Sequence, residues 1–498
     1  MTTLISNPEN SALVSQESEL RLAGTKGYVS YRIRHTLASR FAFLIICLAL
    51  TLSALAYGTV HAWALATFFI GAVVVLVLWV VDCWNLAALR LSRNVLQLPL
   101  LGLLALGLIQ LLPLRTPETV PGIVLPLARS LSFDPNATRF IVIEVVALLI
   151  YFAATLVFVD TPKRLRLLVR TITIFGFFLA IFGLTQSFTS PSRVYWIREL
   201  KQSQAFGPFI NRHHFAAYME LTIGLPLGLV FSNAVEREKK FIYLFAAGLM
   251  AIALIMTNSR GGIISLVAEL LFLVSLIGIR RSHRKKRSEK KPRLQSAAIK
   301  AGLALAMVVA LFGGVVWLGG EQALSRVVGS VNTDDPTTGR AHFWGVTLDI
   351  IRNHPVIGTG LGAFGVVYTG YDSRNGLYRL EQAHNDYLQV LSDGGIVGAV
   401  LGLFFLGALF RMGFVRRESR DDFRRGVATG ALAGCFAALV HSFFDFTLHT
   451  TANTLLFLVL AALATMNGRV EEVHSRRKKK KRESTNGNPR TAEPAIAS

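Results

Sequence analysis

Three arginines and one histidine stand beside long apolar segments, where their side chains could take part in chemistry. They are Arg212, Arg260, Arg340 and His384. A guanidinium group is planar and can bind a phosphate group through two parallel hydrogen bonds. An imidazole can accept a proton near neutral pH and so can act as a general base. These residue types predict a site that binds an anion and contains a candidate base.

Each of these side chains also has a structural interpretation. An arginine at the end of an apolar segment can anchor that end or cap backbone carbonyls, and a lone histidine is more often structural than catalytic. Asp386 and Asp393 follow His384 closely and could orient it or balance its charge. A second polar group is expected to hold helices together through hydrogen bonds. It consists of His441, Asp445 and His449.

The composition indicates what class of protein must position these side chains. Of the 498 residues, 52% are hydrophobic and 16% are charged, and the mean hydropathy is +0.48. Soluble globular proteins carry about 25% charged residues. Because the apolar residues also come in long runs, the sequence indicates a membrane-embedded chain and excludes a disordered, collagenous or disulfide-stapled protein. The three cysteines lack metal-binding spacing, and neither a metal nor a cofactor is expected.

About twelve apolar segments are long enough, with their flanks, to cross a membrane as helices of about 20 residues. Alternating segments of about ten residues, which would indicate a β-barrel, do not occur. The predicted fold is therefore an all-α polytopic integral membrane protein with one large external loop. The predicted spans are Phe41–Val60, Trp63–Val81, Leu98–Leu114, Phe140–Val159, Thr171–Phe188, Phe215–Phe231, Phe241–Met256, Ile263–Ile279, Ala301–Leu318, Ile396–Phe410, Val427–Val440 and Leu455–Met466.

The basic residues predict how the chain crosses the membrane. With a cytoplasmic N-terminus and alternating sides, 39 of the 52 Lys and Arg residues fall inside and 13 outside. Positive charge is enriched on the cytoplasmic side of membrane proteins, so both termini are predicted to be cytoplasmic. The predicted parts are a cytoplasmic tail (1–40), nine spans (41–318), an external loop with a surface helix (319–385), three spans (386–468) and a basic disordered cytoplasmic tail (469–498).

The external loop carries two local patterns. An apolar stripe at helical spacing precedes Pro355 and predicts a surface helix with Thr338 as a possible N-cap. The stripe is Trp344, Leu348, Ile350 and Ile351. The glycine-rich stretch Gly358–Phe364 lacks the Gly-Lys-Ser/Thr of a P-loop and predicts a turn with close backbone packing. Anchoring of the basic cytoplasmic segments to anionic membrane lipids accounts for the net charge of +22, and no nucleic-acid partner is expected.

The motif that carries a family resemblance is His384-Asn385 followed, after nine residues, by Gly395-Ile-Val-Gly398. Five further motifs occur in order around it: Phe209-Ile-Asn-Arg-His-His-Phe215, Asn258-Ser-Arg-Gly-Gly262, Gly339-Arg340 through Trp344, Asn353–Phe364 and Asp445–Asn453. Together they resemble the O-antigen ligase and O-antigen polymerase superfamily, which are bacterial inner-membrane glycan transferases. The resemblance covers about Phe206 to Met466 and leaves the first five predicted spans unaligned.

This resemblance implies a donor glycan on undecaprenyl pyrophosphate at the periplasmic face of the inner membrane, and an acceptor hydroxyl. The acceptor would be a lipid A-core sugar in ligases, another lipid-linked glycan in polymerases, or a protein in related enzymes. Transfer would need no metal or nucleotide sugar, and a single displacement would invert the anomeric centre. His384 would be the catalytic base. The substrate-binding residues would be Arg260, Arg340, Arg212, Asn385 and Asp386.

Two other functions remain open on the sequence. A polymerase for O-antigen or exopolysaccharide would share these motifs, because acceptor identity is not visible in them. A secondary transporter or flippase would share the number of spans. Transporters place ionisable groups near the middle of the bilayer, whereas the apolar segments here are nearly free of charge and Glu269 is the clearest exception. This distribution favours an enzyme at the membrane surface.

Overall fold

The computed structural model describes residues 4–6, 35–115, 129–200, 205–285, 340–373, 380–467 and 470. Within these residues, eight helices are long and apolar enough to cross a membrane. They are α2 (Leu37–Leu55), α3 (Ala62–Leu86), α5 (Pro135–Phe158), α6 (Pro162–Thr189), α7 (Arg212–Phe231), α8 (Arg237–Met256), α13 (Asp386–Arg416) and α14 (Asp422–His441). Two shorter apolar helices are α4 (Gln97–Gln110) and α15 (Thr451–Thr465). The predicted all-α membrane architecture is confirmed.

The predicted spans correspond closely to these helices. The segment Ile263–Ile279 lies in α9 (Arg260–Lys285), which is not among the eight candidate spans. The predicted span Ala301–Leu318 lies outside the described residues, as do most of the two predicted tails. The predicted division of the chain into loops and spans therefore stays a prediction at these places.

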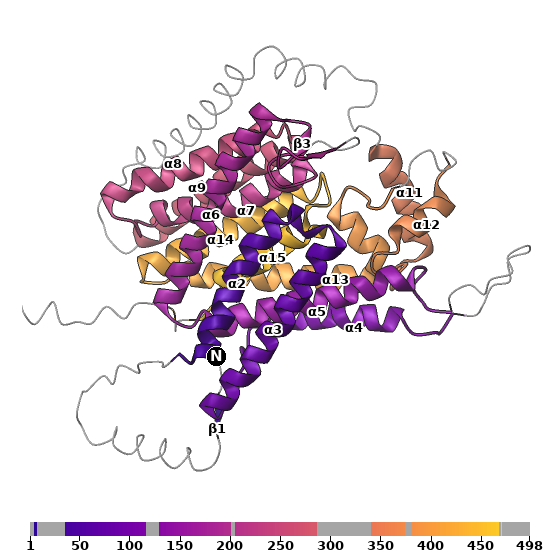
Figure 1. Ribbon diagram of the computed structural model, residues 1–498, viewed down its shortest axis with the longest axis horizontal. Coiled ribbons are helices and arrows are strands. Elements are labelled where there is room, and N and C mark those ends of the chain that lie inside the picture. Colours follow the sequence, from indigo (N-terminus) through magenta and orange to yellow (C-terminus); the bar gives the residue numbers. More distant parts are fainter. Residues whose placement is uncertain are drawn as a thin grey trace, which may run out of the picture.

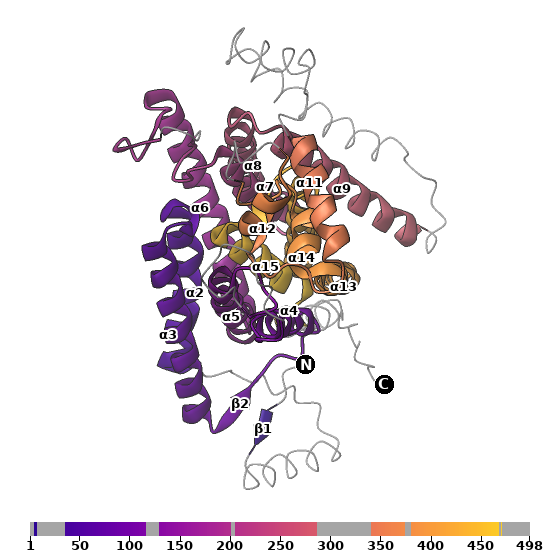
Figure 2. The same cartoon turned by 90° about the vertical axis from the view of Figure 1, so that its right-hand side faces the viewer.

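Three helices occupy the centre of the bundle. In α7 and α14 most of the apolar window is buried inside the protein, and nearly every residue of α15 is buried, whereas only 22% of the window is buried in α3 and in α13. Figure 2 shows the central helices with α2 and α3 on one side and α9 on the other. The two central spans α7 and α14 are also the least apolar of the eight. This is expected, because a helix surrounded by protein need not present an apolar surface to lipid.

Glycines allow α7 and α14 to approach each other closely. A Cβ atom added at Gly224 would lie 2.3 Å from the carbonyl oxygen of Gly430, and one added at Gly228 would lie 2.4 Å from that of Gly426. Small residues at such contacts are typical of helix packing in membranes, where close van der Waals contact replaces the hydrophobic effect.

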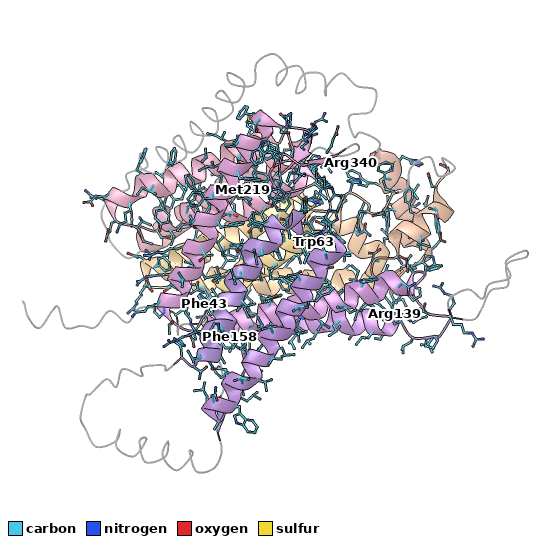
Figure 3. The ribbon with its side chains drawn as sticks, in the orientation of Figure 1. Phe43, Trp63, Arg139, Phe158, Met219 and Arg340 are labelled. Atoms are coloured by element: carbon cyan, nitrogen blue, oxygen red, sulfur yellow. The ribbon has the colours of Figure 1, made fainter. Side chains whose placement is uncertain are left out.

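Two short helices, α11 (Arg340–Asn353) and α12 (Phe364–Tyr371), cap one end of the bundle at the right of Figure 1. In Figure 3, Arg139 and Arg340 lie toward this end, and Phe43 and Phe158 lie toward the other. The cap has its own apolar cluster, formed by Val346, Ile350, Phe364, Val367, Tyr368, Leu380 and Ala383.

The predicted loop helix is therefore present as α11, but its predicted apolar stripe is partly wrong. Leu348 is 43% exposed, whereas Val346 and Ile350 are buried. The helix packs on α12 and α13 with the face that carries the two buried residues. Spacing alone could not identify that face, because Leu348 also fits a helical period.

The fold also contains two pairs of short strands and two one-turn helices. Short antiparallel strands pair β1 (Leu4–Ser6) with β2 (Ala88–Arg90), and β3 (Arg193–Val194) with β4 (Arg198–Glu199). The one-turn helices are η1 (Tyr57–Thr59) and η2 (Thr447–His449). Elsewhere in the bundle, the guanidinium group of Arg90 donates to Asp82 at 3.1 Å and to Asp160 at 2.6 Å. These hydrogen bonds join the ends of α3 and α5.

The helix α13 is broken near its start, and the glycine-rich loop fills the break. Gly395 has φ 59° and ψ −156°, which is not helical. The amides of Thr359 and Gly360 donate to the carbonyls of Ser392 and Asp393, at 2.9 and 3.1 Å. Conversely, the amide of Ile396 donates to Pro355 at 2.8 Å and that of Val397 to Val356 at 3.2 Å. The loop thus satisfies backbone groups that the break would leave unpaired in an apolar environment.

Candidate active site

Four helices begin at the same end of the bundle, and residues at or next to their starts contact one another around one carboxylate. Arg212, Arg260 and Arg340 are the first residues of α7, α9 and α11, and Asn385 is the N-cap of α13. Helix N-termini carry partial positive charge, and their free amides can bind anions. The sequence placed cationic side chains at these starts, so both features favour a negatively charged ligand.

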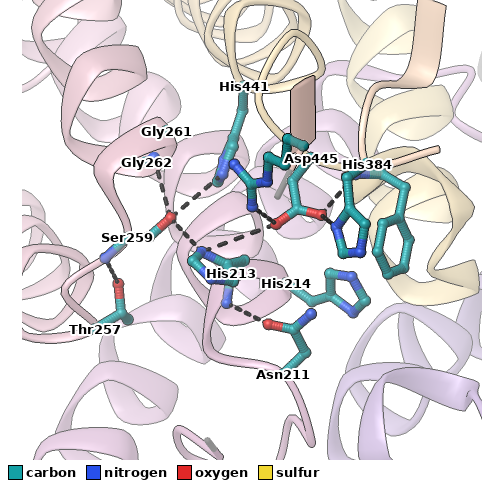
Figure 4. Close-up of polar contacts among 12 residues, drawn as sticks. Asn211, His213, His214, Thr257, Ser259, Gly261, Gly262, His384, His441 and Asp445 are labelled. Carbon is teal, nitrogen blue, oxygen red and sulfur yellow. Dashed lines mark hydrogen bonds and ion pairs between the residues drawn. The ribbon is translucent and has the colours of Figure 1, made fainter. Parts of the chain in front are cut away.

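Asp445 is the carboxylate that these elements share. Its Oδ1 lies 3.1 Å from Nδ1 of His384, and its Oδ2 lies 3.5 Å from Nη2 of Arg340 and 3.9 Å from Nδ1 of His213. The backbone amide of Phe446 also donates to Oδ1 at 2.9 Å. Figure 4 shows these contacts converging on the carboxylate. The residue is 1% exposed, so its charge is stabilised by protein groups rather than by water.

The surroundings of Asp445 keep it ionised. Burial by itself would raise the pKa of this carboxyl group. The hydrogen bond from His384 and the positive charges of His213, His384 and Arg340 outweigh burial, and the pKa of Asp445 lies well below its ordinary value. A carboxylate that only accepts hydrogen bonds fixes the proton of His384 on Nδ1 and leaves Nε2 as the nitrogen able to accept another proton.

His384 is held at the mouth of a cavity. Its backbone φ of 50° is in the left-handed region, which is uncommon outside glycine and is concentrated at functional sites. The imidazole stacks on Phe343 at 6.3 Å and contacts Phe446 edge-on at 4.9 Å between ring centroids. The side chain is 28% exposed and helps to line a cavity of about 470 Å³.

A chain of polar contacts leads from Asp445 into the central helices. Nδ1 of His213 lies 2.8 Å from Oγ of Ser259, which lies 3.4 Å from Nε2 of His441. Nδ1 of His441 lies 2.7 Å from Oε1 of Glu220, and both of these side chains are fully buried. Figure 4 shows the links from Ser259 to both histidines. These contacts tie α7, α9 and α14 together beside the site.

Two cavities adjoin at the site. The first, which His384 lines, is also lined by polar residues such as Glu381 and Thr450. The second has a volume of about 550 Å³ and is lined mostly by apolar side chains of α4, α5 and α13. Glu144, Gln382 and His449 line both. Within the described residues, neither cavity is lined by an arginine or lysine. The arrangement can hold a ligand that is polar at one end and apolar at the other.

The structure brings together some of the predicted site residues and gives others structural contacts. His384 and Arg340 meet at Asp445, whereas Arg212 and Arg260 lie beside His213 and Ser259 in the sequence. Arg260 is exposed, and Arg212 is partly exposed. Substrate binding by these arginines stays a prediction.

Asn385 and Asp386 are engaged within the protein. The side-chain oxygen of Asn385 accepts the amides of Tyr387 and Leu388, and its amide group donates to the carbonyl of Phe443 at 3.1 Å. Asp386 accepts from Nδ1 of His449 at 2.7 Å. Because both side chains are engaged in this way, they would act on substrate mainly through neighbouring residues. Their predicted role in substrate binding also stays a prediction.

The expected partner of His384 is corrected by the structure. The carboxylate that contacts His384 is Asp445, whereas Asp386 holds His449 and Asp393 accepts the amide of Gly362 at 3.0 Å. Sequence proximity suggested the two nearer aspartates, but Asp445 lies 61 positions further along the chain. The sequence analysis placed Asp445 in a group that holds helices together. The sequence signals for its role were its position at the end of a span, on the predicted outer side, and its place in the motif Asp445–Asn453.

The fold and the site together define a membrane-embedded protein with an imidazole–carboxylate pair at one end of its helical bundle. Residues 245–403 match the model of a protein family described as O-antigen ligase. The matched range contains Arg260, Arg340 and His384 and ends before Asp445. The resemblance found in the sequence is thereby confirmed, because this part of the chain is similar to the O-antigen ligase family. None of the curated proteins compared with the chain matches it.

The family match supports lipid-linked glycan transfer in the synthesis of O-antigen or other surface polysaccharides. It also supports an enzyme of the ligase or polymerase type in a bacterial inner membrane.

Proposed function

We propose that the protein transfers a glycan from undecaprenyl pyrophosphate to an acceptor hydroxyl at the periplasmic face of the inner membrane, as an O-antigen ligase does. The observation that carries this proposal is the His384–Asp445 pair, 3.1 Å apart, on a polar cavity that adjoins an apolar one. A lipid-linked glycan has the same two parts. Its prenyl chain suits the apolar cavity, and its sugar suits the polar cavity.

The chemistry of the transfer needs a base more than it needs an acid. An acceptor hydroxyl is a weak nucleophile, and a positioned base accelerates its attack by about 10²–10⁴. His384 is the proposed base, because Asp445 fixes its Nδ1 and leaves Nε2 toward the cavity. Pyrophosphate leaves readily, so a separate general acid is dispensable. Direct attack at the anomeric carbon in a single displacement inverts its configuration, and no metal is assigned a role.

The charge on the departing pyrophosphate needs stabilisation. Arg260 and Arg340 are proposed to bind it, with Arg212 in a lesser role. Support comes from their position at the starts of α7, α9 and α11, where helix dipoles also favour an anion. Arg340 reaches the site through Asp445. Preorganised donors of this kind are worth about 10²–10³ in rate each.

The decisive experiment offers purified protein a lipid-linked glycan together with different acceptors. Transfer to lipid A-core sugar supports the ligase assignment. Extension of another lipid-linked glycan would instead identify an O-antigen or exopolysaccharide polymerase, and modification of a peptide would identify a protein glycosylation enzyme. Failure to transfer to any acceptor, by protein that is folded and monodisperse, would refute the proposal.

A further inference from the structure

A second imidazole–carboxylate pair faces the cavity that contains His384. Nδ1 of His449 donates to Oδ1 of Asp386 at 2.7 Å. The other carboxylate oxygen accepts from Oγ of Ser442 at 2.7 Å and from the amide of Leu448 at 3.2 Å. Because Asp386 fixes Nδ1, the ring nitrogen that remains for a ligand is Nε2. The side chain of His449 is 27% exposed and lines both cavities.

The position of His449 matches one part of a lipid-linked donor. It lies where the polar cavity meets the apolar cavity, together with Glu144 and Gln382. In the donor, the diphosphate is the group that joins the prenyl chain to the sugar. A donor that fills both cavities therefore places its diphosphate beside these three residues. The hydroxyl group of Thr451 donates a hydrogen bond to one carboxylate oxygen of Glu144 at 2.6 Å.

His449 is also the basic group of the junction. Burial would lower the pKa of this imidazole. The hydrogen bond to Asp386 and the negative charges of Asp386, Asp393 and Glu144 outweigh burial, and the pKa of His449 is raised. Other titratable groups that line the first cavity are His214, Glu381 and His384. Since the described lining contains no arginine or lysine, an imidazolium at position 449 would supply positive charge at the junction itself, in addition to the proposed arginines.

We propose that His449, positioned by Asp386, is a second catalytic residue of this site, whose Nε2–H donates a hydrogen bond to the diphosphate of the lipid-linked donor as that group departs. The inference rests on the proposed glycan transfer and adds to it a leaving-group residue distinct from the base and the arginines. Asp386 is a positioning residue, because it acts through His449.

The bond changes balance without any further reactant. The acceptor oxygen forms a bond to the anomeric carbon, and the bond from that carbon to the diphosphate oxygen breaks. The electron pair of the broken bond stays on the diphosphate, where Nε2–H of His449 stabilises it. The acceptor proton passes to Nε2 of His384. His449 keeps its proton throughout.

The test uses the full-length protein and two soluble probes, farnesyl diphosphate and farnesyl monophosphate. The wild type is expected to bind the diphosphate more tightly. His449→Ala should weaken diphosphate binding at least about 10-fold and lower turnover about 10²-fold, as expected for loss of one preorganised donor. His449→Lys should recover part of the binding, because it restores a cation. His384→Ala should lose turnover and keep diphosphate binding. His354→Ala is the control, since His354 contacts Phe133 and Tyr371 away from both cavities.

The pH profile separates positioning from a merely structural role. An imidazolium with a raised pKa is present below that pKa and is lost as the pH rises through it. Affinity for farnesyl diphosphate should therefore fall as the pH rises through the pKa of His449, which gives the pH profile a basic limb. Asp386→Asn removes the charge that raises the pKa, so the basic limb should move to lower pH by at least about one unit.

Two results would overturn the inference. One is unchanged diphosphate affinity in His449→Ala at a wild-type level of folded protein. The other is an unmoved basic limb in Asp386→Asn, which remains informative if His449→Ala is poorly folded. Either result with an active wild type leaves the proposed function standing. A wild type that binds farnesyl diphosphate through His449 but transfers no glycan would contradict the proposed function instead.

Discussion

At the scale of single residues, Asp445 positions His384, the proposed base. It is buried and fixes Nδ1 of His384, while Asp386 does the same for His449. Each pair leaves one ring nitrogen unfixed by a carboxylate, and both histidines line the same cavity. Similar imidazole–carboxylate pairs can thus serve the two halves of one displacement, one at the acceptor hydroxyl and one at the leaving group.

Substituting the proposed base separates a chemical role from a structural one. His384→Gln keeps a hydrogen-bonding group but cannot accept a proton, so transfer should fall at least about 10²-fold. Binding of the lipid-linked donor should stay near that of the wild type. The measurements are initial rates with saturating donor, and donor binding by a direct assay. A well-expressed Gln variant that retains most of its transfer would rule out the base role.

Lysine in place of arginine tests recognition of the pyrophosphate. Arg340→Lys and Arg260→Lys keep the charge but lose the planar fork, so both should weaken donor binding and lower transfer. The Arg340 variant should also loosen Asp445, which accepts from that guanidinium group at 3.5 Å. Donor affinity and rate are measured at matched protein levels. Near-wild-type transfer in both variants would show that these arginines do not bind the pyrophosphate.

Asp445→Asn should change stability in a pH-dependent way. The pKa of Asp445 is lowered in the folded protein, so its stabilising effect is fully present above the ordinary aspartate pKa and is lost as the pH falls through the lowered value. The free energy of unfolding of the variant should be about 2 kcal/mol lower near neutral pH, because a neutral amide replaces the carboxylate of a buried charge-assisted hydrogen bond. Thermal unfolding in detergent at several pH values measures this. A deficit that does not shrink in strong acid would contradict the assignment.

At the scale of elements, the broken helix α13 connects the loop to the site. Its first turn begins at the N-cap Asn385, next to His384, and its break at Gly395 receives the backbone of residues 355–360. The motif of His384-Asn385 and Gly395 therefore combines the proposed catalytic position with the helix break that binds the loop. The loop in turn continues into α12, which packs on α11, the helix that begins with Arg340.

Alanine at position 395 should disturb this connection. The residue needs φ 59° and ψ −156°, and an added Cβ atom would lie 2.4 Å from the carbonyl oxygen of Val356. Gly395→Ala should therefore destabilise the protein by at least about 1–3 kcal/mol and lower transfer. Gly407→Ala in the same helix is the matched control, because an added Cβ there meets no atom within 4 Å. Equal melting temperatures for the two variants would show that the break is not required.

At the scale of the whole molecule, the arrangement separates a lipid-facing surface from a polar end. The outer helices expose large apolar side chains, such as Trp63, Val77 and Trp84 of α3. The central helices bury polar contacts beside the site. This separation fits the proposed binding of a prenyl chain within the bundle and the proposed transfer at one membrane surface.

The topology predicts opposite labelling of two reporter fusions. A fusion after Arg287 should report the cytoplasm and one after Asp335 the periplasm, because basic residues are concentrated on the predicted inner side. Both positions lie outside the described residues, so the expectation rests on the sequence. Cysteine accessibility in intact cells provides an independent measurement. Labelling of both positions from the same side would refute the topology.

The sequence by itself determined the membrane class, most of the helices and the superfamily, because apolar run length and local motifs are properties of neighbouring residues. It also placed the arginines and His384 at helix starts. It could not pair His384 with Asp445, assign Asp386 to His449 or show that one buried face of α11 excludes Leu348. Those features join positions far apart in the chain, and they exist only where the helices have packed and enclosed the two cavities.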